Sequence, residues 1–141
     1  MDEHILPTES EYTECTKLFL EFIQAFKALD HNNALFPKKC RTCGQVFRTY
    51  REYVVCTIPK GHVFEDGSEV MGCSWTMLYR HCTCGNTLVL TLTDETFPDL
   101  DRFWASLRQL AESTGKPLKE IVHNFREECD RHIQRDDLPK Q

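Results

Sequence analysis

The sequence is organised around two short cysteine pairs, Cys40-Arg-Thr-Cys43-Gly44 and Cys82-Thr-Cys84-Gly85. A glycine follows each pair at once. In a metal-binding knuckle the chain turns so that backbone N–H groups point at the thiolate sulfurs, and this turn needs a positive φ just after the second ligand. Glycine adopts that φ without a steric penalty. We therefore interpret the two pairs as the halves of one metal site, with Cys40, Cys43, Cys82 and Cys84 as ligands.

Four thiolates are the usual complement of a closed structural zinc site, and they leave no open position for a substrate or a water molecule. A closed site predicts a structural role for the metal. Because the ligand set uses both tight cysteine pairs, the chain resembles zinc-ribbon and treble-clef domains at the level of the superfamily. This resemblance implies a Zn²⁺ ion held by four cysteines. The single residue between Cys82 and Cys84 departs from the usual two-residue gap, so no narrower family follows.

A rival ligand set comes from the first pair alone, which also resembles the start of a two-cysteine, two-histidine zinc finger. That set consists of Cys40, Cys43, Cys56 and His62. It places a cysteine where the first histidine belongs and puts Pro59 inside the expected last helical turn. It also leaves Cys82 and Cys84 without a metal partner, so we favour the paired knuckles.

The identity of the metal has an alternative too, because four thiolates hold either zinc or an iron–sulfur cluster. Iron–sulfur proteins usually show denser cysteine runs than two pairs separated by a long segment, which favours Zn²⁺. Four thiolates on a dipositive ion leave a charge of about −2. The cations expected to offset this charge are Lys38, Lys39, Arg41 and Arg80. His81 could replace a cysteine in the shell, and we interpret it as lying outside.

Two further cysteines, Cys56 and Cys73, lie between the pairs. If they lay close to the metal, oxidation could pair one of them with a ligand and eject the zinc, as in a thiol redox switch. Neither belongs to a Cys-x-x-Cys motif, which favours the simpler interpretation that both are inert.

Composition predicts one domain over residues 1–141, with 40% hydrophobic and 28% charged residues. The acidic start has no apolar run typical of a secretory signal, and no stretch approaches the length of a membrane span. We therefore expect a cytoplasmic protein, in which eight cysteines argue for metal or redox chemistry over disulfides. The net charge of −5 disfavours nucleic acid and anionic membranes as partners.

The expected fold class is α+β: an N-terminal helix over 9–30, a zinc-binding segment with a small antiparallel sheet over 38–94, and a C-terminal helical hairpin over 97–134. Apolar residues at helical spacing support the first helix, and Thr8 with Glu11 forms a potential capping box. Residues 45–58 fit a helical face by spacing and a strand by their aromatic and β-branched content, and we favour a short helix on spacing. Residues 59–73 predict a long loop or a broken strand.

Apolar and polar residues alternate over 74–81 and 87–93, which predicts two strands joined by the second cysteine pair. The apolar members are Trp75, Met77 and Tyr79 in one strand and Leu88, Leu90 and Leu92 in the other. In the C-terminal hairpin, Gly115 ends one helix and Pro117 begins the next. Ala111, Gly115 and Ile121 match the spacing of a helix-turn-helix, but acidic residues on the second helix disfavour contact with DNA phosphates.

No catalytic serine, phosphate-binding loop or open metal site can be placed on the sequence. The function that we predict is a non-enzymatic cytoplasmic zinc-binding regulatory or accessory protein that acts through contact with another protein or through self-association. The first alternative is a redox or oxygen sensor with an iron–sulfur cluster or a zinc–thiolate switch, and the second is a helix-turn-helix-like transcription regulator.

Overall fold

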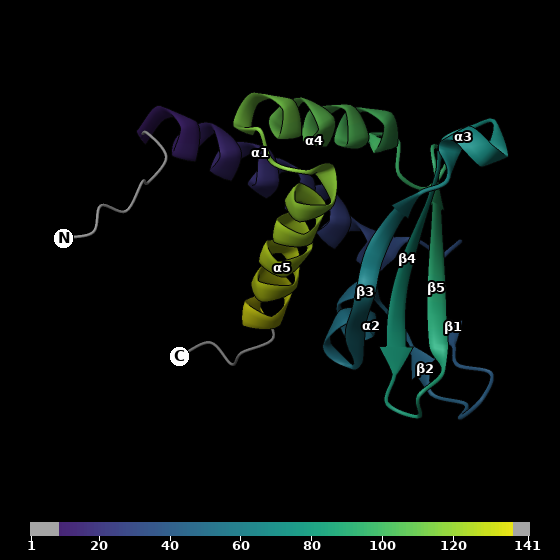
Figure 1. Ribbon diagram of the computed structural model, residues 1–141. Helices are drawn as coiled ribbons and strands as arrows, with labels where there is room; N and C mark the ends of the chain where they lie inside the picture. The colour runs from purple at the N-terminus through teal and green to yellow at the C-terminus, as the bar shows by residue number, and fades with distance from the viewer. Residues whose placement is uncertain (1–8, 137–141) are drawn as a thin grey trace.

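The computed structural model describes the backbone of residues 9–136 and the side chains of 17–59 and 64–134. Its helices are α1 (Glu9–Lys27), the 3₁₀ turn η1 (Ala28–His31), α2 (Tyr50–Val55), α3 (Ser68–Met71), α4 (Leu100–Thr114) and α5 (Leu118–Asp136). Its strands are β1 (Lys38–Lys39), β2 (Val46–Phe47), β3 (Thr57–Asp66), β4 (Trp75–Cys82) and β5 (Thr87–Thr93). They form a two-stranded sheet β1-β2 and a three-stranded sheet β3-β4-β5, both antiparallel. The predicted α+β class, with helices at both ends of the chain, is confirmed (Figure 1).

The apolar stripe of the first helix faces the interior as predicted. Phe22, Ile23 and Phe26 in α1 are fully buried, and Leu29 continues the stripe into η1. After η1, the Asn32 side-chain oxygen accepts a hydrogen bond from the Ala34 N–H at 2.9 Å, which turns the chain towards β1. The predicted capping box at Thr8 lies outside the described residues.

The short helix predicted within 45–58 is present as α2, and it begins at a cap formed by Thr49. The Thr49 hydroxyl accepts a hydrogen bond from the Glu52 N–H at 3.0 Å, and the Glu52 carboxylate accepts one from the Arg48 N–H at 2.8 Å. Each bond satisfies an N–H group that the helix cannot pair internally. The β-branched run after Cys56 then enters β3.

The segment predicted as a loop or broken strand is for the most part strand β3, which pairs with β4 over Thr57–Asp66. The register shifts between Pro59 and Phe64, so the strand is interrupted. A proline removes one ladder donor and is tolerated at a sheet edge, where β3 lies in the order β3-β4-β5. The rest of the segment contains the single turn α3.

The alternation that located β4 did not identify its buried face. Thr76, Leu78 and Arg80 are buried in β4, whereas Trp75, Met77 and Tyr79 are half-buried on the opposite face. In β5 the leucines at 88, 90 and 92 are buried, as the pattern indicates. The sheet register requires this arrangement because those leucines pair with Arg80, Leu78 and Thr76.

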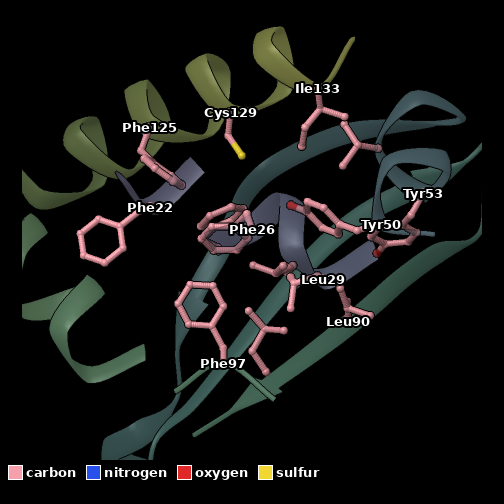
Figure 2. Packing of buried hydrophobic residues seen from close by; sticks show 14 of the residues in the cluster. Phe22, Phe26, Leu29, Tyr50, Tyr53, Leu90, Phe97, Phe125, Cys129 and Ile133 are labelled. Atoms are coloured by element: carbon pink, nitrogen blue, oxygen red, sulfur yellow. The ribbon is translucent and has the colours of Figure 1, made fainter. Parts of the chain in front are cut away.

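Aromatic rings form the centre of the core, between the helices and the buried face of the sheet (Figure 2). The Phe26 ring lies 4.8 Å from Phe97, 5.4 Å from Phe64 and 5.6 Å from Phe125 between ring centroids. These contacts connect α1 with β3, with α5 and with the segment that precedes α4. Cys40 and Cys82, one from each cysteine pair, belong to the same cluster of buried residues, so the knuckles are attached directly to the core.

A buried ion pair joins β4 to α5. The Arg80 guanidinium donates to the Asp130 carboxylate at 3.0 Å, to the Thr57 hydroxyl at 2.6 Å and to the Val54 carbonyl at 3.1 Å. The expectation that Arg80 offsets charge at the metal site is therefore wrong. Its guanidinium is bound by Asp130, Thr57 and Val54, because a buried cation needs a counter-ion and hydrogen-bond acceptors.

The two C-terminal helices are confirmed, and Gly115 adopts the left-handed conformation that ends α4 (φ 74°). The helix α5 leaves this turn at a steep angle to α4 and runs down beside α2 and β3 (Figure 1). Asp130 and Phe125, both on α5, thus reach the sheet and the aromatic core.

Candidate metal centre

The two cysteine pairs occupy turns of the same local geometry. The first lies between β1 and β2, where the Cys40 N–H donates to the Gln45 carbonyl at 2.8 Å and the Gly44 N–H donates to the Cys40 carbonyl at 2.8 Å. The second lies between β4 and β5, where the Cys82 N–H donates to the Asn86 carbonyl at 2.9 Å and the Gly85 N–H to the Cys82 carbonyl at 2.8 Å. A hairpin turn thus presents each pair.

The glycines adopt the predicted conformation, with φ of 82° at Gly44 and 95° at Gly85. Side chains other than glycine rarely adopt such values. No other heavy atom lies within 4 Å of the position that a Cβ would occupy at either residue. The requirement for glycine is therefore a matter of backbone conformation and not of space.

The four sulfur atoms of Cys40, Cys43, Cys82 and Cys84 lie within 4.8 Å of one another, so the cluster could hold a metal ion. Cys40 Sγ is 3.7 Å from Cys84 Sγ, and Cys43 Sγ is 3.5 Å from Cys82 Sγ. In each pair the first cysteine is buried and the second is exposed. An ion held by all four would lie at the edge of the core, with the outer half of its shell towards solvent.

The thiols of the cluster differ in acidity. Hydrogen bonds from the Cys43 backbone, and then from Thr42 and the Asn86 side chain, lower the pKa of Cys40 to about 6 against the effect of burial. The Asn86 backbone N–H lowers the pKa of Cys84, but burial and the neighbouring thiols outweigh it and raise that pKa to about 11. The Gln45 backbone likewise lowers the pKa of Cys43, while Cys82, burial and Cys40 give a net increase. A cation is needed before Cys43 and Cys84 can ionise beside the Cys40 thiolate.

This difference in acidity predicts a pH dependence of metal binding. At pH 7 without metal, Cys43 and Cys84 keep their protons, because even an unperturbed thiol is mostly protonated at this pH and their pKa values are raised further. An incoming metal must displace these protons. Affinity should therefore fall with acidification, by about tenfold per pH unit for each displaced proton. Isothermal titration calorimetry with Zn²⁺ in buffers of different ionisation enthalpy measures the released protons. Binding without proton release at pH 7 would contradict this.

Two amide side chains complete the surroundings of the cluster, and the sequence interpretation missed both. Asn86 Nδ2 lies 3.6 Å from Cys40 Sγ, and Gln45 Oε1 lies 3.7 Å from Cys82 Sγ. Each amide directly follows the glycine of its own pair and reaches a sulfur of the other pair. The repeated pattern of glycine then amide is the signal that could have located them.

The remaining candidates do not join the cluster. Among the residues that the structure describes, the four cysteines are the only group of three or more potential ligands whose donor atoms gather. Cys56 is half-buried against the core, Cys73 is exposed, and His81 is also absent from the group. The side chain of His62 lies outside the described residues.

Comparison with known proteins adds no further assignment: no protein-family model, curated protein or solved structure matches this chain. None of the helices within residues 9–136 is long and apolar enough to cross a membrane. The class that fold and site support is an α+β chain with a potential four-cysteine metal centre.

Proposed function

We propose that this chain is a zinc-binding protein in which the metal is structural, and that it acts without catalysis, as a cytoplasmic regulatory or accessory protein, by contacting another protein. The observation that carries the proposal is the gathering of four cysteine sulfurs from two separate hairpins. Four protein ligands fill a tetrahedral shell, so a substrate or an activated water has no position on the ion. The metal would then connect β1-β2 to β4-β5.

Distances within the cluster support a single ion. Four sulfurs at about 2.3 Å from a tetrahedral centre lie about 3.8 Å from each other. The Sγ–Sγ distances are 3.5 Å between Cys43 and Cys82 and 3.7 Å between Cys40 and Cys84, and no other pair of these sulfurs is more than 4.8 Å apart. These distances match the spacing around one tetrahedral ion. A cluster of several irons places iron and sulfide between the thiolates and spreads them further apart, so the geometry favours Zn²⁺ over an iron–sulfur cluster.

Elemental analysis of protein purified anaerobically, together with its visible spectrum, tests the metal assignment. We expect one zinc per chain and a colourless solution, because Zn²⁺ has a filled d shell. A brown solution with acid-labile sulfide would instead support the iron–sulfur sensor. A coloured protein with one iron and no sulfide would also overturn the zinc assignment.

The contact surface that we propose is the face of the three-stranded sheet opposite the helices. Ile58 in β3 is 58% exposed and Val89 in β5 is 39% exposed. Trp75, Met77 and Tyr79 of β4 lie half-buried on that face between them. Apolar and aromatic residues gathered across three strands are typical of surfaces that bind proteins.

Replacing Ile58 with Glu and Val89 with Lys in one variant should abolish partner capture, because both charges fall within the proposed contact surface. Affinity capture from the native cell extract with quantitative mass spectrometry measures this, and light scattering on the purified chain measures self-association. A matched control is Arg131→Gln, on the exposed side of α5. Equal capture by all three proteins, or no partner and a monomer for the unmodified chain, would refute the contact proposal.

A further inference from the structure

A cavity of about 550 Å³ opens at the corner between α4 and α5, beside the end of β3. Its apolar wall consists of Phe64, Trp104, Leu118 and Val122. This volume falls within the range of small-molecule sites, about 300–1,000 Å³. The lining includes none of the four cysteines and neither of the amides beside them, so the cavity is separate from the metal centre.

The acidic residues in the cavity lining already have partners in the protein. Glu65 accepts a hydrogen bond from the Tyr79 hydroxyl at 3.0 Å, and Asp66 accepts one from the Ser68 hydroxyl at 2.7 Å. The further ion-pair partners are Arg108 for Asp66 and Lys116 for Glu120. Asp66 and Glu120 are thus compensated by cations, whereas Glu65 has only the neutral Tyr79 hydroxyl as its partner.

The basic residues of the lining are not balanced in the same way. Arg126 shares its carboxylate partner, Asp130, with Arg80: the two guanidinium nitrogens lie 3.4 Å and 3.0 Å from the same Asp130 oxygen. The side chains of Arg80, Arg126 and Asp130 are only 3%, 13% and 10% exposed. Two guanidinium groups and one carboxylate leave one positive charge in a poorly solvated place, where an anion stabilises it.

A second cation borders the cavity at the start of α5. Lys119 is exposed, and no described carboxylate forms an ion pair with it. The first turn of α5, which Lys119 belongs to, also has N–H groups without partners inside the helix, and such groups favour an anion nearby. Arg126 and Lys119 both line the cavity and are seven residues apart on the same helix, about 10.5 Å along its axis, so a head group that contacts both requires their long side chains to converge on it.

We propose that this cavity binds a small carboxylate with an apolar body. The carboxylate lies between Arg126 and Lys119, and the apolar body lies against Trp104, Leu118 and Val122. The terminal nitrogens of Arg126 contact Asp130 and His123, and its ε N–H has no hydrogen-bond partner in the protein. A charged carboxylate is the strongest acceptor for such a cation, which favours this anion over a hydroxyl or an amide. The single excess buried charge favours a monoanion, and the apolar wall favours a hydrocarbon chain or ring over a sugar or a nucleotide.

Calorimetric titration of the full chain, with its metal, tests this using octanoate as the probe. Octanamide is the matched uncharged ligand because it has the same chain length and differs in the head group. We expect saturable binding of one octanoate per chain, a change in tryptophan fluorescence because Trp104 lines the cavity, and affinity for octanamide lower by about tenfold or more. No saturable octanoate binding, or equal affinity for the two ligands, would overturn the proposal.

Variants of the two cations make the test specific to the site. Lys119→Gln and Arg126→Gln should each weaken octanoate binding by about tenfold and leave octanamide binding unchanged. Arg131→Gln, on the same helix but outside the cavity lining, should bind octanoate like the unmodified chain. Lys119 is exposed, so Lys119→Gln keeps its fold and decides the outcome even if Arg126→Gln is unstable. Unchanged octanoate affinity in Lys119→Gln refutes the assignment.

Discussion

Replacing Cys82 and Cys84 with serine together should remove the metal and with it most of the stability of the chain. The four sulfurs lie within 4.8 Å of one another, yet they come from hairpins far apart in the sequence. Zinc binding contributes about 10–16 kcal/mol in zinc-finger peptides, which matches or exceeds the net stability of about 5–15 kcal/mol typical of native proteins. Even part of that loss shifts the equilibrium towards the unfolded state.

The measurements are zinc content at equal protein concentration and thermal unfolding followed by circular dichroism. Strong chelation of the unmodified chain at neutral pH should produce the same loss of stability. Cys56→Ser is the matched control, because Cys56 is half-buried but lies outside the cluster. Full metal occupancy in the double variant, together with metal loss in Cys56→Ser or His62→Ala, would instead support the finger-like ligand set. An unchanged thermal midpoint after complete metal removal would show that the metal is not structural.

The cysteine cluster could be predicted from the sequence because its signals are local. A tight cysteine pair followed by glycine constrains both the residue types and the backbone, and the structure confirms the positive φ at Gly44 and Gly85. That the two pairs share one ion could also be predicted, because either pair alone supplies only two of the four ligands that a structural zinc site needs. The helices were also predictable, because stripes such as Phe22, Ile23 and Phe26 repeat at the helical period.

The buried face of β4 could not be predicted, since both of its faces carry residues that suit an interior. Alternation identifies a strand, but it does not say which of the two faces is buried. In β4 one face carries large apolar and aromatic side chains, and the other carries polar side chains that pair with buried groups of other elements. Thr76 is buried because the Trp104 indole N–H donates to its hydroxyl at 2.8 Å. Arg80 is buried because Asp130 lies opposite, fifty residues later in the chain. Such pairings are tertiary and have no local signal.

The cavity beside α5 was missed for the same reason. Its walls come from β3, α4 and α5, and none of these segments has a recognisable binding motif. The excess positive charge at Arg126 depends on its sharing Asp130 with Arg80. The sequence shows only mixed charges on this helix, which look like an ordinary solvated surface.

Replacing Asp130 with alanine should destabilise the chain by about 3–5 kcal/mol, the cost typical of removing one partner from a buried ion pair. The side chains of Asp130 and Arg80 are only 10% and 3% exposed. The substitution leaves the guanidinium groups of Arg80 and Arg126 close together without a counter-ion. Urea unfolding of the metal-bound protein measures the change as a lower midpoint at constant m-value.

Two comparisons separate this electrostatic cost from a general effect of mutating α5. Glu128→Ala removes a carboxylate on the same helix that pairs with Arg131 at the surface, and exposed pairs contribute only about 0–1 kcal/mol. The combined change Arg80→Met, Arg126→Met and Asp130→Leu removes all three buried charges, so it should recover much of the stability lost in Asp130→Ala. If Asp130→Ala cost no more than Glu128→Ala, the ion pair would not be what holds α5 against β4, and apolar contacts such as Phe125 with Phe64 would have to supply that stability.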